Sequence, residues 1–576
     1  MTPTGGQFSP SERDVLRRVI ESRRDVRRRF TDRPVPDEVL ERILAAAHRA
    51  PSVGLSQPWD FLVITDPDTR RRVRAYVEQE RARFADVLPA GRSRQFDRLK
   101  VEAIVEAPVS IVVTSTLERG GANVLGRQLQ PETAVFSTCL AIENLWLTAR
   151  AEGLGVGWVS FYRPGELSGL LGLPAHVTPV AYLCVGFVED FDAEPELALA
   201  GWARPRPLSW AVHRETWANR SARPLEEALQ SVGELDAAAM EAAAEHHDRL
   251  TKPRGSLGEL ETVGVRLAGI AGTSPPPIPE PATVAVFAGD HGVVRSGVTP
   301  WPAEVTRQMV ANFTAGGAAI NVLARQCGAE VIVVDVGVAG DLEAVPKLLR
   351  RKVRAGTADL RVGPAMTVAE AAAALDVGAE VARELVSSGA RCLVTGDMGI
   401  GSTTASAALI ARLTGRSASE VTGRGTGIDD AMLRHKTAVI DEALARTAAL
   451  PDAGDPVVTL ASLGGLEIAA LAGYMIGGAA ARVPVVVDGV IAAAALLVAA
   501  GIEARVVDYC FAGHLSVEPG AAVALGQLGL RPLLDLDLRL GEGTGACLAL
   551  PILQSAARVL REMATFDQAG VTDKDA

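Results

Sequence analysis

With 576 residues, the chain is too long for a single hydrophobic core, and its length predicts two to four domains. Hydrophobic residues make up 48% of it and charged residues 22%, which is typical of an ordinary globular protein. The formal net charge of −11 argues against non-specific binding to nucleic acid. The six cysteines include no CxxC pair, so we expect neither a disulfide framework nor a metal site. We expect the protein to work in a reducing, cytoplasmic setting.

Neither export nor a membrane span is expected. The first residues, MTPTGGQFSPSERD, have no apolar core of the kind that a signal peptide needs. The longest apolar run, GVIAAAALLVAAG from Gly489, is too short to cross a membrane and is predicted to be a buried helix.

The chain is predicted to divide near residue 223. Between Gly201 and Leu225 the periodic pattern gives way to a stretch rich in Pro, Arg and Trp, which is typical of a linker. We therefore expect one domain over residues 1–222 and a second over residues 223–576. A further break, GTSPPPIPEP, is interpreted as a rigid loop inside the second domain.

The first half mixes helices and strands. PDEVLERILAAAHRA (36–50) carries apolar residues at helical spacing, and Pro51 ends it. DFLVITD, PVSIVVTS and VAYLCVGFVED are short β-rich runs. TAVFSTCLAIENLWLTARAEG (133–153) is apolar on most faces, which predicts a long, central, buried helix.

The second half alternates strands and helices more regularly. ATVAVFAGD, AEVIVVDVG, ARCLVTGD and VPVVVDG are continuous apolar runs, each of which ends in Gly or Asp. Parallel strands covered on both faces have this pattern, with functional loops at their carboxyl ends. We expect a three-layer α/β fold with a mainly parallel, Rossmann-like sheet.

Basic residues near the N-terminus form a candidate anion site. SRRDVRRRF places Arg23, Arg24 and Arg27 around Asp25, and arginine forks bind phosphate bidentately. A solvated basic helix end would have the same pattern. APSVGLSQPWDF (50–61), with small and polar residues before a strand, and the glycine-rich GLGVGWVSFY (153–162) favour a cofactor, because backbone amides can approach a flat ring there.

In order along the chain, the arginine cluster, APSVG, QPW, LKVEAIVEAPVSIVV, NLWLTARAEGLGVGWVS and EPELA resemble the nitroreductase-like flavoproteins. More narrowly, they resemble the 5,6-dimethylbenzimidazole synthases over residues 10–218, most specifically from Asn144 to Ser160. The resemblance implies a nitroreductase-like α+β fold that binds reduced FMN and consumes it with dioxygen to give 5,6-dimethylbenzimidazole, the lower ligand of vitamin B12. The arginines near Trp202, in GWARPRPL, depart from the expected register.

The same resemblance implies roles for individual residues. By this resemblance, the FMN phosphate and ribityl chain are contacted by Arg23, Arg24 and Arg27. The isoalloxazine ring is contacted by Ser52, Gly157 and Trp158. Asp25 and Ser160 match the two polar residues that distinguish the synthases. Asp25 is either an acid/base for the proton transfers of ring fragmentation or an ion-pair partner for the arginines. Ser160 either positions a peroxide or flavin edge or satisfies a strand end.

The stretch TGDMGIGSTTAS (395–406) is nearly a phosphate-binding loop. Gly396 and Gly401 have the spacing of a nucleotide-binding loop, and Ser402 and Thr403 follow, but the lysine after the second glycine is absent. A helix N-terminus with free amides and hydroxyls binds an anion without lysine, although close strand–helix packing selects glycine equally well. We expect the loop to hold a phosphate while bonds change elsewhere.

Two further segments carry candidate polar groups. FAGDHGVV ends a strand with Asp290 and His291, and LRLGEGTGACLALP sets Glu542 between glycines ahead of an apolar helix. A carboxylate among apolar segments has a raised pKa and acts as a general base, whereas a surface glutamate in a glycine turn has no such role. Both readings of Glu542 are open from this segment alone.

Several segments together resemble the nicotinate-nucleotide–dimethylbenzimidazole phosphoribosyltransferases over residues 225–564: LTKPRGSLGELE, AGDHGVV, TGDMGIGSTTASAA, GRGTGIDD, ASLGGLEIAALAGYMIGGAA, VVVDG and SVEPG. That family moves phosphoribose from nicotinate mononucleotide to dimethylbenzimidazole, giving α-ribazole phosphate and nicotinate. The resemblance makes Glu542 the catalytic base. It implies substrate contacts at Gln308 (with Met309 nearby), Asp397, Gly399, Gly401, Ser402, Thr403 and Lys436. His291 is either mechanistic or a satisfied loop histidine.

The product expected from the first half is the acceptor expected by the second. The sequence therefore predicts a bifunctional enzyme of cobalamin lower-ligand synthesis, an oxidoreductase fused to a glycosyltransferase, served by a separate flavin reductase. The alternatives keep the transferase and make the first half an FMN-dependent NAD(P)H oxidoreductase or a non-catalytic flavin or benzimidazole carrier. A homodimer is implied by the resemblance to nitroreductases.

Overall fold

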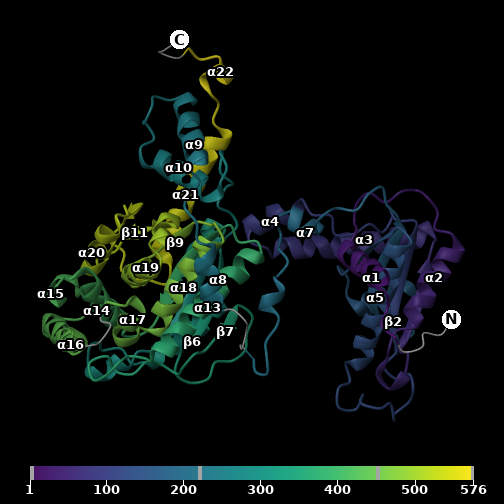
Figure 1. The fold of residues 1–576 in the computed structure, drawn as a ribbon, viewed down its shortest axis with the longest axis horizontal. Helices are drawn as coiled ribbons and strands as arrows, with labels where there is room; N and C mark the ends of the chain where they lie inside the picture. The colour runs from purple at the N-terminus through teal and green to yellow at the C-terminus, as the bar shows by residue number, and fades with distance from the viewer. Residues whose placement is uncertain (1–5, 218–222, 449–453, 573–576) are drawn as a thin grey trace. The chain divides into compact units, whose positions relative to one another are not determined.

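The computed structural model describes residues 6–217, 223–448 and 454–572, and contacts divide the chain into two compact units (Figure 1). The first unit comprises Met1–Leu88 and Arg92–Ala203, and the second comprises Pro89–Gly91 and Arg204–Ala576. The predicted boundary between residues 222 and 223 falls at the segment 218–222, which lies outside the described residues, and it stays a prediction.

The first unit is built on a four-stranded antiparallel sheet with the strand order β1-β2-β4-β3. The strands are β1 (Trp59–Ile64), β2 (Val109–Ser115), β3 (Leu154–Val159) and β4 (Thr178–Phe187). β2 is buried along its whole length, with Val109, Ile111 and Val113 on one face and Ser110, Val112 and Thr114 on the other. The short apolar runs predicted as strands in this half are confirmed.

A long helix forms the centre of the first unit. α5 (Thr133–Ala151) packs on the sheet and on α2 (Asp37–His48), and Ile142 and Leu145 are fully or almost fully buried. The predicted central helix and the predicted helix before Pro51 are therefore confirmed. The other helices of this unit are α1 (Pro10–Ser22), α3 (Pro67–Asp86), α4 (Ala90–Asp97), α6 (Pro164–Leu171) and α7 (Glu196–Leu199), with a 3-10 turn at Val53–Leu55.

The second unit contains a six-stranded parallel sheet with the order β10-β9-β8-β5-β6-β7. The strands are β5 (Ala282–Gly289), β6 (Glu330–Gly337), β7 (Leu348–Arg350), β8 (Cys392–Met398), β9 (Val485–Val487) and β10 (Cys510–Ala512). All eight residues of β5, the central strand, are buried. The four apolar runs predicted as parallel strands form β5, β6, β8 and β9, so this prediction is confirmed.

Helices cover both faces of this sheet. On β5, the Phe287 ring packs against Tyr474 of α18 (Leu466–Ala480). Gly396 of β8, which stands in register with Val286, faces the backbone of Glu542, just ahead of α21 (Thr544–Glu562). Because neighbouring residues of a strand point to opposite faces, α18 and α21 lie on opposite sides of the sheet. The expected three-layer α/β fold is confirmed.

The chain order creates a crevice at the middle of the sheet. From β5 the strands run outward on one side through β6 and β7, and on the other side through β8, β9 and β10. In open α/β sheets, ligands bind outside the carboxyl ends of the strands where the strand order reverses. That position here lies between the ends of β5 and β8.

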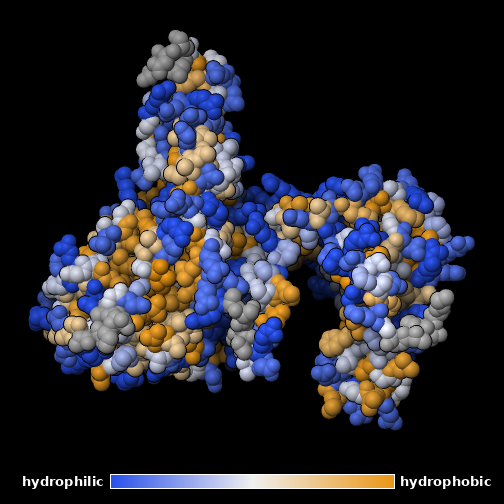
Figure 2. Space-filling model, in the orientation of Figure 1, coloured by the Kyte–Doolittle hydropathy of each residue, from blue (hydrophilic) through white to orange (hydrophobic). Residues whose placement is uncertain are grey.

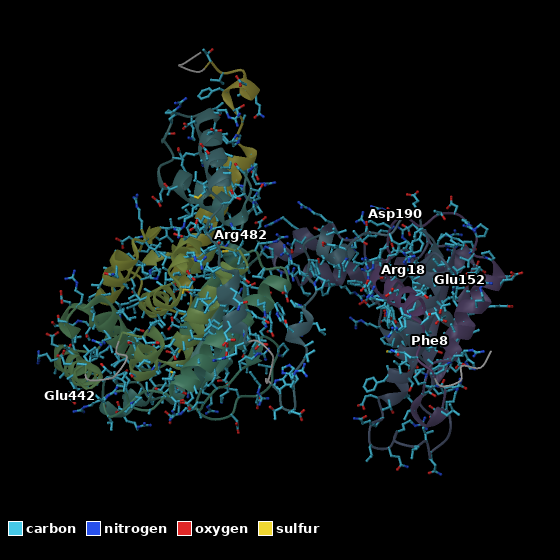
Figure 3. All side chains as sticks on the ribbon, viewed as in Figure 1. Phe8, Arg18, Glu152, Asp190, Glu442 and Arg482 are labelled. Atoms are coloured by element: carbon cyan, nitrogen blue, oxygen red, sulfur yellow. The ribbon has the colours of Figure 1, made fainter. Side chains whose placement is uncertain are left out.

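A helical lobe projects from the sheet in Figure 1. It is formed by α9 (Ala237–Arg249), α10 (Glu259–Ala271), the end of α21 and α22 (Phe566–Ala569). Arg482, labelled in Figure 3, ties the base of this lobe to the body of the unit. Its guanidinium donates to the carbonyl oxygens of Glu234, Gly269 and Ile270 and to the Tyr509 hydroxyl.

The remaining elements of the second unit complete its layers. Its other α-helices are α8 (Pro224–Ser231), α11 (Glu304–Ala315), α12 (Ala319–Cys327), α13 (Val368–Ser387), α14 (Ser402–Thr414), α15 (Ala418–Val421), α16 (Asp430–Ala448), α17 (Pro456–Leu463), α19 (Val490–Ile502) and α20 (Pro519–Leu528). β11 (His514–Leu515) and β12 (Leu534–Asp535) form a small parallel ladder, and 3-10 turns occur at Leu208–Trp210, Gly292–Ser296 and Ala504–Tyr509. α19 is the predicted buried helix after Gly489. Among the described residues, no helix has the length and apolarity needed to cross a membrane.

Candidate active sites

Three neighbouring strands of the second unit end in carboxylates at the crevice. Asp290 follows β5, Asp397 lies near the end of β8, and Asp488 follows β9. All three side chains are buried. Burial raises the pKa of Asp397 well above its ordinary value, and the nearby carboxylates of Asp488, Glu467 and Glu542 act in the same direction. The site is therefore a cluster of acidic groups in which the Asp397 carboxyl favours its protonated form.

The glycine-rich loop after β8 packs directly on the end of β5. A Cβ atom at Gly399 would lie 2.3 Å from the carbonyl oxygen of Gly289, and one at Gly401 would lie 3.0 Å from the Cβ of His291. Gly401 also has a φ of +98°, which L side chains rarely adopt. Close packing thus accounts for both glycines. The loop then leads into α14, whose N-terminal turn begins with Ser402 and Thr403.

A lysine reaches this helix N-terminus from a distant part of the chain. The Nζ of Lys436, on α16, donates to the Thr403 hydroxyl at 2.9 Å and to the Gly423 carbonyl oxygen at 3.2 Å. The side chain is buried, and burial lowers its pKa to about 8, while the charge of Glu518 opposes that shift. The loop sequence contains no lysine, but the fold brings the Lys436 ammonium to the first turn of the helix that follows the loop.

Glu518 is a residue of this cluster to which sequence reasoning gave no role. It is buried, and its Oε1 accepts a hydrogen bond of 2.7 Å from the Gly425 N–H. A Cβ atom at Gly423 would lie 2.1 Å from its Oε2, so the glycines of the GRGTG segment wrap around this carboxylate. The only signal in the sequence was its place in the motif SVEPG.

Glu542 has the environment of a general base. It is buried in a left-handed conformation, with φ of 62°, between two glycines that also have positive φ. Its Oε2 accepts the Ile320 N–H at the start of α12, 3.4 Å away. Burial raises its pKa, the Ile320 N–H opposes the shift, and the charge of Asp488 adds to it. The reading of Glu542 as an exposed glutamate in a glycine turn is wrong.

His291 belongs to a buried pair beside the loop. Its Nε2 lies 2.6 Å from the Oε1 of Glu467 at the start of α18, and both side chains are buried. Burial lowers the pKa of His291, but the Glu467 carboxylate more than offsets this, so the pKa is raised overall. The ion pair accounts for Nε2, whereas the buried Nδ1 of His291 has no hydrogen-bond partner among the described residues, so the reading as a fully satisfied loop histidine stays a prediction. Gln308 lies exposed on α11 and Met309 is half-buried, and the role of Gln308 in seating the aromatic base stays a prediction.

In the first unit, Asp25 joins the arginine cluster to the edge of the sheet. Its Oδ1 accepts the Trp158 N–H at 2.9 Å, and its Oδ2 lies 2.5 Å from Nη2 of Arg27, which also donates to the Trp158 carbonyl oxygen. Burial raises the pKa of Asp25, while Arg27, the Trp158 N–H and Arg23 act against the shift. This geometry is that of the ion-pair alternative for Asp25.

The other residues predicted to contact flavin differ in their surroundings. Arg24 donates to the carbonyl oxygens of Glu21, Arg23, Asp192 and Ala193, which ties two loops together. A Cβ atom at Gly157 would lie 2.2 Å from the Val26 carbonyl oxygen, so this glycine makes room for the chain itself. Structural roles therefore account for both residues, and their flavin contacts stay predictions.

The predicted roles of Arg23, Ser52 and Ser160 stay predictions. The Arg23 guanidinium lies over the Trp146 ring, 4.9 Å from its centroid, and its side chain is partly exposed. Ser52 accepts the Gln57 N–H through its hydroxyl, and Ser160 is exposed just after β3.

Comparison with known proteins identifies the larger part of the chain. Residues 232–571 match the family model described as Phosphoribosyltransferase. A nicotinate-nucleotide–dimethylbenzimidazole phosphoribosyltransferase of Salinispora tropica is 56% identical over 364 residues, which cover 61% of this chain and all of that protein. The crystal structure of CobT from Thermus thermophilus is 50% identical, with a TM-score of 0.56, and the match covers 58% of this chain and 99% of that one.

The chain belongs to this phosphoribosyltransferase family. Residues 20–187 match a second model, the Nitroreductase family, so a nitroreductase-like domain precedes the phosphoribosyltransferase domain. The phosphoribosyltransferase match includes Asp397, Lys436 and Glu542, and the nitroreductase match includes Asp25 and Ser160. The predicted fusion of these two families is confirmed.

Proposed function

We propose that the chain performs two successive reactions of cobalamin lower-ligand synthesis. The phosphoribosyltransferase domain moves phosphoribose from nicotinate mononucleotide to 5,6-dimethylbenzimidazole, and the nitroreductase-like domain makes that benzimidazole from reduced FMN. The observation that carries the first assignment is Glu542, a buried glutamate with a raised pKa whose backbone lies against β8 of the parallel sheet. The loop after β8 leads to the N-terminus of α14, which Lys436 contacts.

In the transfer step, Glu542 accepts the proton of one benzimidazole nitrogen while the other nitrogen attacks the anomeric carbon of the ribose. The bond from that carbon to the nicotinate nitrogen breaks, and nicotinate leaves with the electron pair. A general base near its working pH contributes about 10²–10⁴-fold to such a step. The raised pKa of Glu542 suits this role, because a more basic carboxylate accepts the proton more readily.

The loop and Lys436 hold the 5′-phosphate of the nucleotide in this proposal. The amides of the first turn of α14 carry the positive end of the helix dipole, and the Ser402 and Thr403 hydroxyls lie on the same turn. Lys436 already donates to Thr403, so its charge is fixed beside the same turn. The phosphate is a handle and no phosphoryl group moves, so a metal is not required. Asp397 lies near the nicotinate in this proposal, where a protonated carboxyl can donate to the leaving group.

For the first domain, the proposal assigns FMN as a consumed substrate and dioxygen as co-substrate. Arg23 is partly exposed, and the buried Nε of Arg27 has no hydrogen-bond partner in the described part of the chain, so both fit a phosphate. Reduced flavin supplies the carbon skeleton and the electrons. Asp25 holds Arg27 and the Trp158 amide in place, and Ser160 is exposed just after β3.

A second candidate for the first domain is an ordinary FMN-dependent NAD(P)H oxidoreductase. The observation that favours it is the pairing of Asp25 with Arg27 and the Trp158 N–H, because a carboxylate used in this way is not free for proton transfer. A non-catalytic flavin or benzimidazole carrier is a third candidate. Loss of the flavin in the presence of dioxygen separates the first proposal from both of the others.

We also propose that the chain forms a homodimer through its first domain and is served by a separate flavin reductase in the cytoplasm. Large apolar side chains around the N-terminal end of α5 are exposed, as Figure 2 shows for this part of the surface: Leu117, Leu125, Leu129, Phe136 and Leu140. Such patches mark protein interfaces. The six cysteines are free, in agreement with a reducing compartment.

The experiment that tests the transferase assignment supplies the purified chain with nicotinate mononucleotide and 5,6-dimethylbenzimidazole and follows nicotinate and α-ribazole phosphate by mass spectrometry. Equal amounts of both products support it, and hydrolysis of the nucleotide without a ribosylated benzimidazole contradicts it. In parallel, FMN with a flavin reductase, NADH and air tests the first domain. Unchanged total flavin there contradicts the fragmentation proposal.

A further inference from the structure

The N-terminus of α21 is capped by a side chain from another element. Asp488, which follows β9 and is 1% exposed, accepts the Gly543 N–H through Oδ2 at 3.1 Å and the Ala546 N–H through Oδ1 at 2.9 Å. Gly543 is the N-cap residue of α21 and has no side chain with which to cap the helix itself. Asp488 therefore provides the carboxylate that a helix N-terminus requires.

This cap lies directly beside Glu542. Gly541, Glu542 and Gly543 have φ values of 80°, 62° and 92°, three consecutive residues in the left-handed region. A glutamate is held in such a conformation only where its surroundings fix it. The carboxylate of Asp488 fixes the residue that follows Glu542, and the Glu542 backbone on its other side lies against Gly396 of β8.

Asp488 is also one of the charges that Glu542 faces. The carboxylate of Asp488 approaches Glu542 from the end of β9, the Asp397 carboxyl, which favours its protonated form, approaches it from β8, and the Ile320 N–H approaches it from α12. Behind Asp488, the Nε2 of His514 on β11 lies 3.5 Å from its Oδ1. Gly545 gives the His514 ring its space, because a Cβ atom there would lie 2.0 Å from the ring.

We propose that Asp488, with His514 behind it, is a positioning residue for Glu542: its carboxylate fixes the backbone conformation of the base and sets the charge that the base experiences. Protonated His514 partly neutralises the negative charge of Asp488 and so weakens its effect on Glu542. This inference rests on the proposed role of Glu542 as the general base. It adds two residues that touch neither substrate but determine the pH at which the base works.

The sign of the effect follows from the charges. Removing the negative charge of Asp488 lowers the pKa of Glu542, so the acid limb of the kcat/KM profile, where the base is protonated, moves to lower pH. Removing the positive charge of protonated His514 leaves Asp488 uncompensated, raises the pKa of Glu542 and moves the same limb to higher pH. A residue with only a structural role lowers the rate at every pH and leaves the limb in place.

The test measures kcat and kcat/KM for nicotinate mononucleotide against pH in the parent chain and in D488N, H514Q and D335N. Asp335 is the matched control, a carboxylate at the end of β6 that is 2% exposed and caps Val338 but does not adjoin Glu542. We expect about a tenfold loss of kcat and a downward shift of the limb in D488N, an upward shift in H514Q, and an unmoved limb in D335N.

If D488N is folded by circular dichroism and its limb does not move, the inference is wrong. If D488N does not fold, H514Q decides alone: an unmoved or downward limb overturns it. An inactive parent chain contradicts the transferase assignment instead, so the two failures are distinct.

Discussion

The ammonium of Lys436 lies 2.9 Å from the hydroxyl of Thr403, although the two residues are 33 positions apart. This contact brings a cation to the N-terminus of α14, directly after a loop whose own sequence lacks lysine. A nucleotide-binding loop that drives phosphoryl transfer carries its lysine within the loop. Here the lysine is on a separate helix and faces the helix N-terminus, which is the arrangement expected of an anchor for a phosphate that does not react.

Replacing Lys436 by methionine is predicted to weaken binding of nicotinate mononucleotide. The loss of a hydrogen bond to a charged group costs about 1.5–3 kcal/mol, which corresponds to a rise in KM of about 10- to 100-fold. In the parent chain, KM is also predicted to rise with pH through about 8, because Lys436 loses its proton there. Steady-state kinetics from pH 6 to 9 measure both effects. A pH-independent KM in the parent chain would contradict the anchoring role, and Lys436→Arg, which keeps its charge at every pH, is the control.

Replacing Glu542 by glutamine is predicted to lower the rate of transfer by about 10²–10⁴-fold, because the base is lost while the shape of the site is kept. Formation of dimethylbenzimidazole by the first domain remains intact. Since the pKa of Glu542 is raised, the parent chain is predicted to lose activity on the acid side at a higher pH than an unperturbed glutamate would give. Single-turnover measurements of nicotinate release follow this change. A variant with full activity would remove Glu542 from the mechanism.

Replacing Asp25 by asparagine is predicted to abolish dimethylbenzimidazole formation and to leave transfer to added dimethylbenzimidazole unchanged. The substitution removes the charge that pairs with Arg27 and keeps a carbonyl oxygen for the Trp158 N–H. Titration with FMN separates the two roles of Asp25. Unchanged FMN affinity with lost chemistry indicates an acid/base, whereas weakened FMN binding indicates a partner for the arginines. Loss of both activities in a folded variant contradicts the two-site account.

Replacing Gly157 by alanine is predicted to destabilise the first unit. The added Cβ atom would lie 2.2 Å from the Val26 carbonyl oxygen and would push the Asp25–Val26 segment off β3. Overpacking of this kind costs about 1–3 kcal/mol. Gly165→Ala is the matched control, because nothing lies within 4 Å of a Cβ atom there. Scanning calorimetry measures the difference, and equal melting temperatures for the two variants would show that the added Cβ atom is accommodated at Gly157 without a clash.

The layers of the second unit were predictable because buried parallel strands have an unmistakable pattern. β5, β6, β8 and β9 are continuous apolar runs that end in Gly or Asp, and each was located from that pattern. The pattern also placed the loops that follow these strands at one edge of the sheet. The glycine-rich loop at Gly399 follows β8 at that edge, whereas Glu542 was located from its place between two glycines ahead of an apolar helix.

The partners of these residues were not predictable from local sequence. Asp488 caps Gly543 from 55 positions away, and Glu518 binds the Gly425 amide from 93 positions away. No periodicity or spacing in a single sequence encodes such contacts, because they depend on which strand ends are neighbours. Gly157 shows the opposite difficulty: a glycine that makes room for the chain has the same local signature as one that makes room for a ligand.

The measurement that tests the central claim most directly uses FMN labelled with carbon-13 in the isoalloxazine ring. The purified chain receives this FMN with a flavin reductase, NADH, air and unlabelled nicotinate mononucleotide, and no dimethylbenzimidazole is added. We predict that α-ribazole phosphate carrying the flavin label accumulates and that both E542Q and D25N abolish it, the former with labelled dimethylbenzimidazole left over. If the label stays in FMN while added dimethylbenzimidazole is still ribosylated, the first domain does not make the acceptor and the two-step account is wrong.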